Sequence, residues 1–128
     1  MLTLNPFGKL MRNRSGGMAD EFALIATPLV LLLLATMEIG RGLWIQNALN
    51  YSVEGAARCA SIDVNNCGTT TQIKSYAAGL SGAGFATTVF TPSTAACGNQ
   101  VSASYPMTFD IPFASVSLTL TAQSCYPK

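Results

Sequence analysis

The 128-residue chain has no histidine, and charged residues make up only 10% of it. Histidine is the usual general base of serine and cysteine hydrolases and the commonest metal ligand, so its absence argues against both kinds of site. We therefore expect no enzyme, no cofactor and no metal. The net charge of +1 predicts no basic surface for nucleic acid. A hydrophobic content of 49% instead indicates a chain that folds or enters a membrane.

The few charges are unevenly distributed. Residues 1–16 contain Lys9, Arg12 and Arg14 and no acidic residue, whereas residues 17–128 contain all six acidic residues of the chain. The two regions are therefore suited to different surroundings, and the first sixteen residues have the character of a basic leader.

An apolar run follows this leader. The stretch from Phe22 to Met37 contains no charged residue and is apolar on all sides. As a helix it would be about 24 Å long, slightly short of the hydrocarbon core of a bilayer, which is about 30 Å thick. A secretory signal peptide has a similar apolar segment. However, 21 residues precede the run and no small-residue cleavage site follows it, so a membrane anchor is favoured.

Beyond the apolar run the pattern becomes that of an amphipathic helix. One helix is predicted from about Ala19 to Ala60, apolar all round in its first half and one-sided in its second. Glu38 and Arg41 have the spacing of an opposite-charge pair on a helix. Glu54 and Arg58 have such a spacing too. The residues expected on the buried face are Ile45, Ala48, Leu49, Ser52, Val53, Ala56, Ala57 and Ala60.

The remaining region is poor in charge, with three charged residues and eighteen Ser and Thr in residues 69–128. Its patterns predict a short helix and three antiparallel strands, the last two joined by a turn at the sequence DIPF. The predicted ranges are 71–80 for the helix and 85–91, 100–109 and 115–122 for the strands. The sheet has one apolar face, and the amphipathic half of the long helix is the element available to cover it. The expected fold class is therefore α+β.

The chain has four cysteines, Cys59, Cys67, Cys97 and Cys125, and none belongs to a CxxC pair. A four-thiolate zinc site usually takes its ligands in close pairs, so two disulfides in an oxidising compartment are favoured. Cys59 and Cys67 enclose the turn that leaves the long helix. We therefore favour Cys59–Cys67 and Cys97–Cys125, although spacing alone does not decide between the three possible connectivities.

The second of these bridges depends on the pairing of the last two strands. We expect Val101 to lie opposite Leu120. Cys97 would then lie one residue away from the level of Cys125. A bulge at Gly98 would bring the two sulfur atoms together at the open end of the hairpin.

Residues 14–60 combine the basic leader, Gly16 and Gly17, then Glu21 and Phe22, and then an apolar helix that becomes amphipathic. This order resembles a prepilin and, more narrowly, the TadE-like minor pilins or pseudopilins of the Tad (Flp) pilus, a branch of the type IV filament superfamily. The resemblance continues through "FALIATPLVLLLL", "EIGRGLWIQNALNYSVEGAARCA" and a late "SYPMTF". It implies a pilin-like fold, with the long helix packed on the small sheet.

The resemblance also implies processing and location. A prepilin peptidase on the cytoplasmic side would cut after Gly16, so that the mature chain begins at Gly17. The parts would be a cleaved leader (1–16), a transmembrane or filament-core half-helix (17–40) and a periplasmic pilin-like domain (41–128). The implied partners are major and minor pilin subunits, the inner-membrane assembly platform and membrane lipid. The implied location is the bacterial inner membrane, crossed once, with a place in an extracellular pilus left open.

In this family a glutamate at the fifth mature position pairs with the new amine of a neighbouring subunit, and Glu21 matches that position. The simpler alternative is that Glu21 only favours the start of the helix, where an acidic residue is stabilising. Asp20 is a departure, because relatives often have a small apolar residue there. We favour the pairing role, since a helix cap does not explain Gly16 and the basic leader.

Two functions of different classes follow. The first is a structural minor pilin that helps filament initiation, assembly or adhesion. The family's major pilins are much shorter and almost wholly helical, so the added domain points to a minor component. The alternative is an uncut single-pass anchor that presents a disulfide-bonded periplasmic domain to a ligand.

Overall fold

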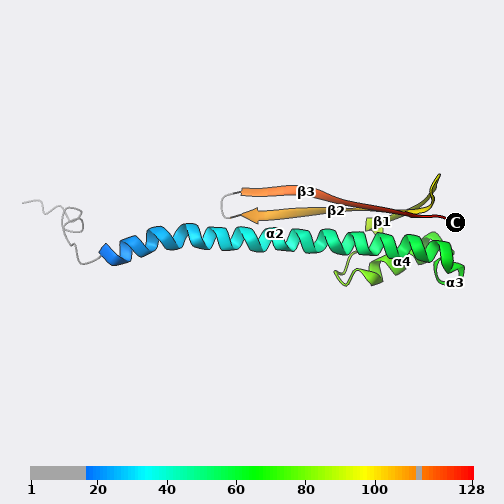
Figure 1. Ribbon diagram of the computed structural model, residues 1–128, viewed down its shortest axis with the longest axis horizontal. Coiled ribbons are helices and arrows are strands. Elements are labelled where there is room, and N and C mark those ends of the chain that lie inside the picture. Colours follow the sequence, from blue (N-terminus) through cyan, green and yellow to red (C-terminus); the bar gives the residue numbers. More distant parts are fainter. Residues whose placement is uncertain (1–16, 112–113) are drawn as a thin grey trace, which may run out of the picture. The chain divides into compact units, whose positions relative to one another are not determined.

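The computed structural model describes residues 17–111 and 114–128, so the expected leader lies outside the described residues. The chain divides into two compact units, Met1–Thr36 and Met37–Lys128. Helix α2, Gly17–Ile62, contributes to both units (Figure 1). Its bounds confirm the single long helix predicted from the sequence.

The second unit is built around the amphipathic part of α2. The side chains of Leu49 and Val53 are 0% and 1% exposed, and every residue expected on the buried face is buried or half-buried. This face packs against one side of the sheet and against α4. The other members of this core are Ala77, Phe85, Phe90, Val101, Ala103, Met107 and Ala122. The helix covers the apolar face of the sheet, as predicted, and the α+β fold class is confirmed.

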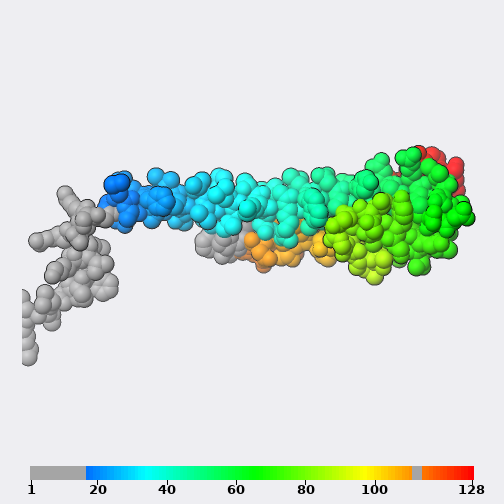
Figure 2. Space-filling view, turned by 90° about the horizontal axis from the view of Figure 1, so that it is seen from below, coloured from blue at the N-terminus to red at the C-terminus, as the bar shows by residue number. Residues whose placement is uncertain are grey.

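Two short helices follow α2. Helix α3, Val64–Cys67, begins after Asp63, whose side chain accepts hydrogen bonds from two backbone N–H groups of its first turn. Helix α4, Thr70–Leu80, confirms the predicted second helix. It begins with a capping box in which Thr69 and Gln72 each accept a hydrogen bond from the other's backbone N–H. Figure 2 shows residues of α4 and the segment after it (yellow-green) packed beside the green part of α2.

The sheet has three antiparallel strands in the order β1-β2-β3. They are β1, Phe90–Ala95; β2, Gly98–Ile111; and β3, Ala114–Tyr126. The two longer strands begin and end within a few residues of the predicted ranges. The expected DIPF turn includes residues 112 and 113, which lie outside the described part of the chain.

The first strand was predicted wrongly. The range 85–91 contains a short 3-10 helix, Thr87–Val89, and the strand begins only at Phe90. The strand also continues past Pro92, which lacks the N–H group that a strand ladder uses. β1 is an edge strand, however, and there a proline can turn its nitrogen away from the sheet.

The predicted pairing of the last two strands was also wrong. Val101 lies opposite Ser124 rather than Leu120, a shift of four residues. The register runs without interruption from Asn99↔Tyr126 to Ile111↔Ala114, so the expected bulge at Gly98 is not formed. Alternating hydrophobicity fixes which face a residue occupies, but it is insensitive to a slip by an even number of residues. The faces of the strands were therefore predicted correctly and the pairing was not.

The structure contains the two disulfides favoured from the sequence, Cys59–Cys67 and Cys97–Cys125. Their Cα atoms are 5.7 and 6.2 Å apart, within the usual range. Cys97 reaches its partner from the tight turn between β1 and β2 instead of through a bulge. Gly98 follows it with φ = 125°, a conformation that favours glycine.

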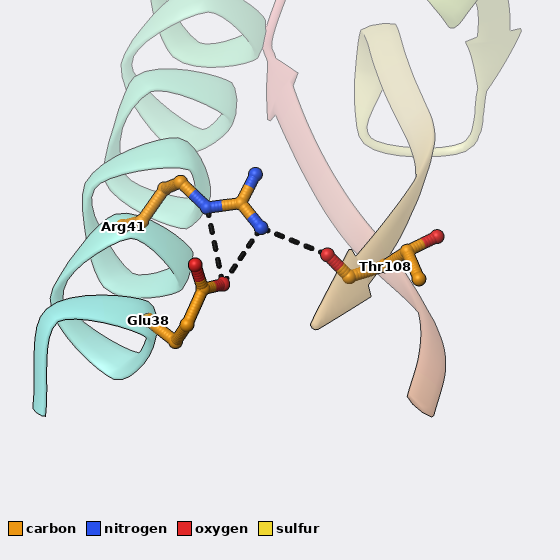
Figure 3. A network of polar contacts seen from close by, with 3 residues as sticks. All are labelled: Glu38, Arg41 and Thr108. Atoms are coloured by element: carbon orange, nitrogen blue, oxygen red, sulfur yellow. Dashed lines mark hydrogen bonds and ion pairs between the residues drawn. The ribbon is translucent and has the colours of Figure 1, made fainter. Parts of the chain in front are cut away.

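Long side chains of α2 reach both strands of the β2–β3 hairpin. Arg41 donates to the carbonyl oxygen of Thr108 in β2 at 2.8 Å and forms an ion pair with Glu38 at 2.7 Å (Figure 3). On the other flank, Gln46 donates to the carbonyl oxygen of Thr121 in β3 at 2.9 Å. The helix is thus fastened to the hairpin by polar contacts on both sides of its apolar face.

Candidate functional site

The head of α2 contains the acidic residues to which the sequence assigned the assembly role. Asp20 and Glu21 lie in adjacent positions of the helix and both are exposed. They therefore point about 100° apart around the helix axis. No ion pair joins either carboxylate to another residue that the structure describes. Gly17 begins the helix, and Gly16 lies outside the described residues.

The apolar run that follows has no partner within the described part of the first unit. Phe22 is 73% exposed and Leu32 is 60% exposed. An 18-residue window of α2 has a mean hydropathy of 2.2, which makes the helix a candidate membrane span by length and composition. The hydroxyls of Thr27 and Thr36 donate to helix carbonyl oxygens at 2.8 Å. These polar groups are satisfied inside the helix, as a lipid environment requires.

The second unit presents an open groove between α2 and α4. Its volume is about 980 Å³, and its lining includes Tyr51, Glu54, Arg58, Tyr76 and Leu80. Both tyrosines are more than 40% exposed. Two aromatic rings beside charged and amide groups can bind a polar ligand or an extended peptide. The groove could not be predicted from the sequence, because it depends on how α4 packs against α2.

A glycine sets the width of this groove. A Cβ atom added at Gly55 would lie 2.5 Å from Cδ1 of Leu80, so the small residue lets α4 approach α2 closely. Glu54 and Arg58, one on each side of Gly55 in the sequence, do not form the ion pair expected from their spacing. Both side chains are instead exposed at the groove.

Asp63 lies where α2 passes into α3, beside the same groove. The side-chain amide of Asn66 donates to its carboxylate at 2.7 Å, and the backbone N–H groups of Asn66 and Asn65 donate to it at 3.2 Å. Hydrogen bonds to a carboxylate stabilise its charged form. These bonds, that of the Asn66 side chain first, hold the pKa of Asp63 below its ordinary value.

Metal-binding chemistry finds no support in the described residues. No group of three or more His, Cys, Asp or Glu side chains comes together among residues 17–111 and 114–128. All four cysteines are used in disulfides. The features available for function in this part of the chain are therefore an exposed apolar helix, two carboxylates at its head and the groove.

The comparisons with known proteins bear on the same helix. No curated protein matches the chain, and no solved structure matches it. The family model of TadE-like proteins matches residues 16–58, about a third of the chain. The matched stretch begins at Gly16, includes Glu21 and the exposed apolar run, and ends near the close of the buried face of α2. Over these residues the chain is similar to TadE-like proteins, as its resemblance to that family predicted.

Proposed function

We propose that the chain is a structural minor subunit, a pseudopilin, of a Tad-type pilus. One observation carries the proposal: an apolar half-helix that no other described residue covers, headed by Glu21, lies in the stretch that matches the TadE-like family. An enzyme would need a constellation of reactive groups, whereas a filament subunit needs a helix that exchanges lipid for neighbouring helices.

The first step of the proposed mechanism is processing. The leader, with three basic residues and no acidic one, would stay in the cytoplasm because positive segments flank the inner side of membrane helices. A prepilin peptidase would then cut between Gly16 and Gly17. Glycine suits such a site because it has no side chain to obstruct the approach of the enzyme. The cut gives Gly17 a positively charged amine close to Glu21.

The second step is assembly with other pilin subunits at the inner-membrane platform. In lipid, a lone carboxylate near the bilayer centre costs about 3 kcal/mol on insertion scales. The Coulomb attraction to the amine of a neighbouring chain is about 4 kcal/mol, before desolvation of the two charges, at a separation of about 4 Å and an effective dielectric constant of about 20. Pairing of Glu21 would therefore favour movement from the lipid into a helix bundle. The second unit would lie on the periplasmic side.

The test compares two adjacent carboxylates in the full chain, expressed with its pilus machinery. Glu21→Ala is expected to leave cleavage and membrane insertion intact and to reduce recovery in sheared filaments or with partner pilins. Asp20→Ala is the matched control, one residue away on a different side of the helix, and should have a milder effect. Intact mass checks that both variants lose residues 1–16.

The alternative function is a single-pass anchor that presents the second unit to a ligand, and the groove beside Tyr51 and Tyr76 favours it. It predicts a chain that keeps Met1 and a Glu21→Ala variant that behaves like the parent. Either result would replace the pilin proposal with the anchor.

A further inference from the structure

Part of the second unit combines exposed apolar side chains that its own core does not use. On α2 these are Ile39, Leu43 and Trp44, which are 59%, 61% and 56% exposed. On β3 they are Val116 and Leu118, which are 54% and 53% exposed. We call these five residues the apolar band.

Two contacts place the five residues at one end of the unit. A Cβ atom added at Gly42 would lie 2.8 Å from the ring of Phe109 and 3.9 Å from Met107. Phe109 pairs with Val116 across the hairpin, and Met107 pairs with Leu118. Both β3 residues of the band therefore lie at the level of Gly42. In the sequence of α2, Gly42 follows Ile39 and precedes Leu43 and Trp44.

At the opposite end of the unit, hydrogen bonds join α2 to the sheet. There Asn99 donates to the carbonyl oxygen of Ala60 at 3.0 Å, and Ser61 donates to that of Tyr126 at 3.3 Å. The hairpin thus runs antiparallel to α2, with its turn end beside the part of α2 that begins the unit. Figure 2 agrees, with the orange end of the hairpin beside the cyan part of α2.

One exposed charge at this end, Asp110 of β2, alternates with Phe109 and so lies on the face of the hairpin turned away from the helix. Glu38 and Arg41 are paired with each other, and Arg41 also donates to a backbone oxygen. Strand β3 contains no charged residue. Its alternate residues are apolar on the face toward the helix and carry hydroxyls at Ser115, Ser117 and Thr119 on the other face. An amphipathic surface of this kind is suited to the boundary between acyl chains and head groups.

We infer that the apolar band rests in the surface of the bilayer, so that the second unit itself is a membrane-contacting domain. The inference rests on the proposed function, because it takes α2 to be anchored in that membrane. Three features favour lipid over a protein partner. The band lies where α2 continues into the uncharged run 22–37. Trp44, the single tryptophan of the chain, is the residue type enriched at membrane interfaces. The third feature is that the band includes side chains from both α2 and β3, as expected of a surface that rests on a plane.

Tryptophan fluorescence provides the test. The full chain is placed in phosphatidylcholine–phosphatidylglycerol vesicles whose acyl chains carry bromine either near the glycerol or near the chain end. Wild-type Trp44 should lose emission most strongly with bromine near the glycerol. In a Trp44→Phe background, Leu118→Trp moves the probe to the hairpin and Tyr126→Trp moves it about 26 Å along the same strand. Leu118→Trp should be quenched like Trp44, and Tyr126→Trp should not.

A further variant separates this inference from the proposed function. Leu32→Trp in the same background places the probe in the apolar run, where bromine near the chain end should quench it. Quenching of Leu32→Trp without quenching of Leu118→Trp would overturn the inference and leave the membrane anchor in place. If Leu32→Trp is not quenched either, both proposals fail.

Two controls test whether the tryptophan on the hairpin reports contact with lipid. Val116→Trp replaces Leu118→Trp if circular dichroism shows that the latter does not fold, and the same quenching is expected of it. An unquenched probe at either position with blue-shifted emission would mean that protein covers the band, and would overturn the inference.

Discussion

The two parts of α2 contain similar apolar residues in opposite surroundings. Leu32 in the first unit is 60% exposed, whereas Leu49 in the second is 0% exposed. The chemistry of the side chain is the same, so the difference lies in the pattern around it. The first part is apolar on all sides and offers no preferred face. The second part concentrates its small and apolar residues on one face, which the sheet can cover. One helix therefore combines an exposed apolar part with a part that is buried on one face.

The largest expected effect comes from truncating one leucine in each part. Leu49→Ala should destabilise the second unit by about 2–5 kcal/mol, because it leaves a cavity in a packed core. Leu32→Ala should leave the unfolding of that unit unchanged. Urea unfolding in detergent, followed by near-ultraviolet circular dichroism of the aromatic residues, measures both. Equal effects would mean that the two parts of α2 are not distinct in their packing.

The disulfides sharpen the comparison, because all four cysteines lie in the second unit. Replacing both members of Cys97–Cys125 by serine should cost about 2–5 kcal/mol of that unit's stability. The same change at Cys59–Cys67 should cost about 1 kcal/mol less, because this bridge closes a loop of 8 residues rather than 28. Thermal unfolding of the two double variants ranks them. A reversed order would show that local packing outweighs loop length.

Two helix glycines give a smaller effect on a finer scale. Gly40 has no neighbouring atom within 4 Å among the described residues outside its own helical turn, whereas Gly42 meets the ring of Phe109. Gly40→Ala should stabilise the second unit by up to about 1 kcal/mol through helix propensity. In Gly42→Ala the new methyl group must displace the Phe109 ring, which cancels the gain in helix propensity. The free energies of unfolding of the two variants should therefore differ by about 1 kcal/mol. The urea concentrations at the midpoints of unfolding compare the two variants. Equal midpoints would contradict the close contact between Gly42 and Phe109.

Features of the fold that depend on local spacing could be predicted from the sequence, whereas features that depend on packing between elements could not. Helical periodicity specified the buried face of α2 from Ile45 onward, since burial there follows the spacing of small and apolar residues, but it missed the buried Gly42. The pairing of Val101 was missed because hydrophobic alternation permits even slips. The start of β1 was missed because alternation over residues 85–91 does not distinguish a strand from the short 3-10 helix that Thr87–Val89 forms. The groove at Gly55 was missed because the presence of a glycine does not indicate which side chain packs against it.

The smallest effect concerns pH. Because hydrogen bonds lower the pKa of Asp63 in the folded chain, their contribution to stability is present above the unfolded pKa of about 4 and is lost as the pH falls through the folded value. The second unit should therefore lose some stability below about pH 4. Asp63→Asn should remove this part of the pH dependence. Unfolding midpoints of parent and variant across this range measure it, and parallel curves would exclude the effect.

The polar contacts of Arg41 and Gln46 have a consequence for crowding. A hairpin with free backbone groups along its outer strands is a template on which other chains can stack into cross-β aggregates. Confinement to a membrane plane would raise the frequency of such encounters. Arg41 occupies the carbonyl oxygen of Thr108, Gln46 occupies that of Thr121, and Pro106 has no N–H to offer. For the proposed membrane-anchored pilin, these contacts would discourage association through strands and leave association through the helices open.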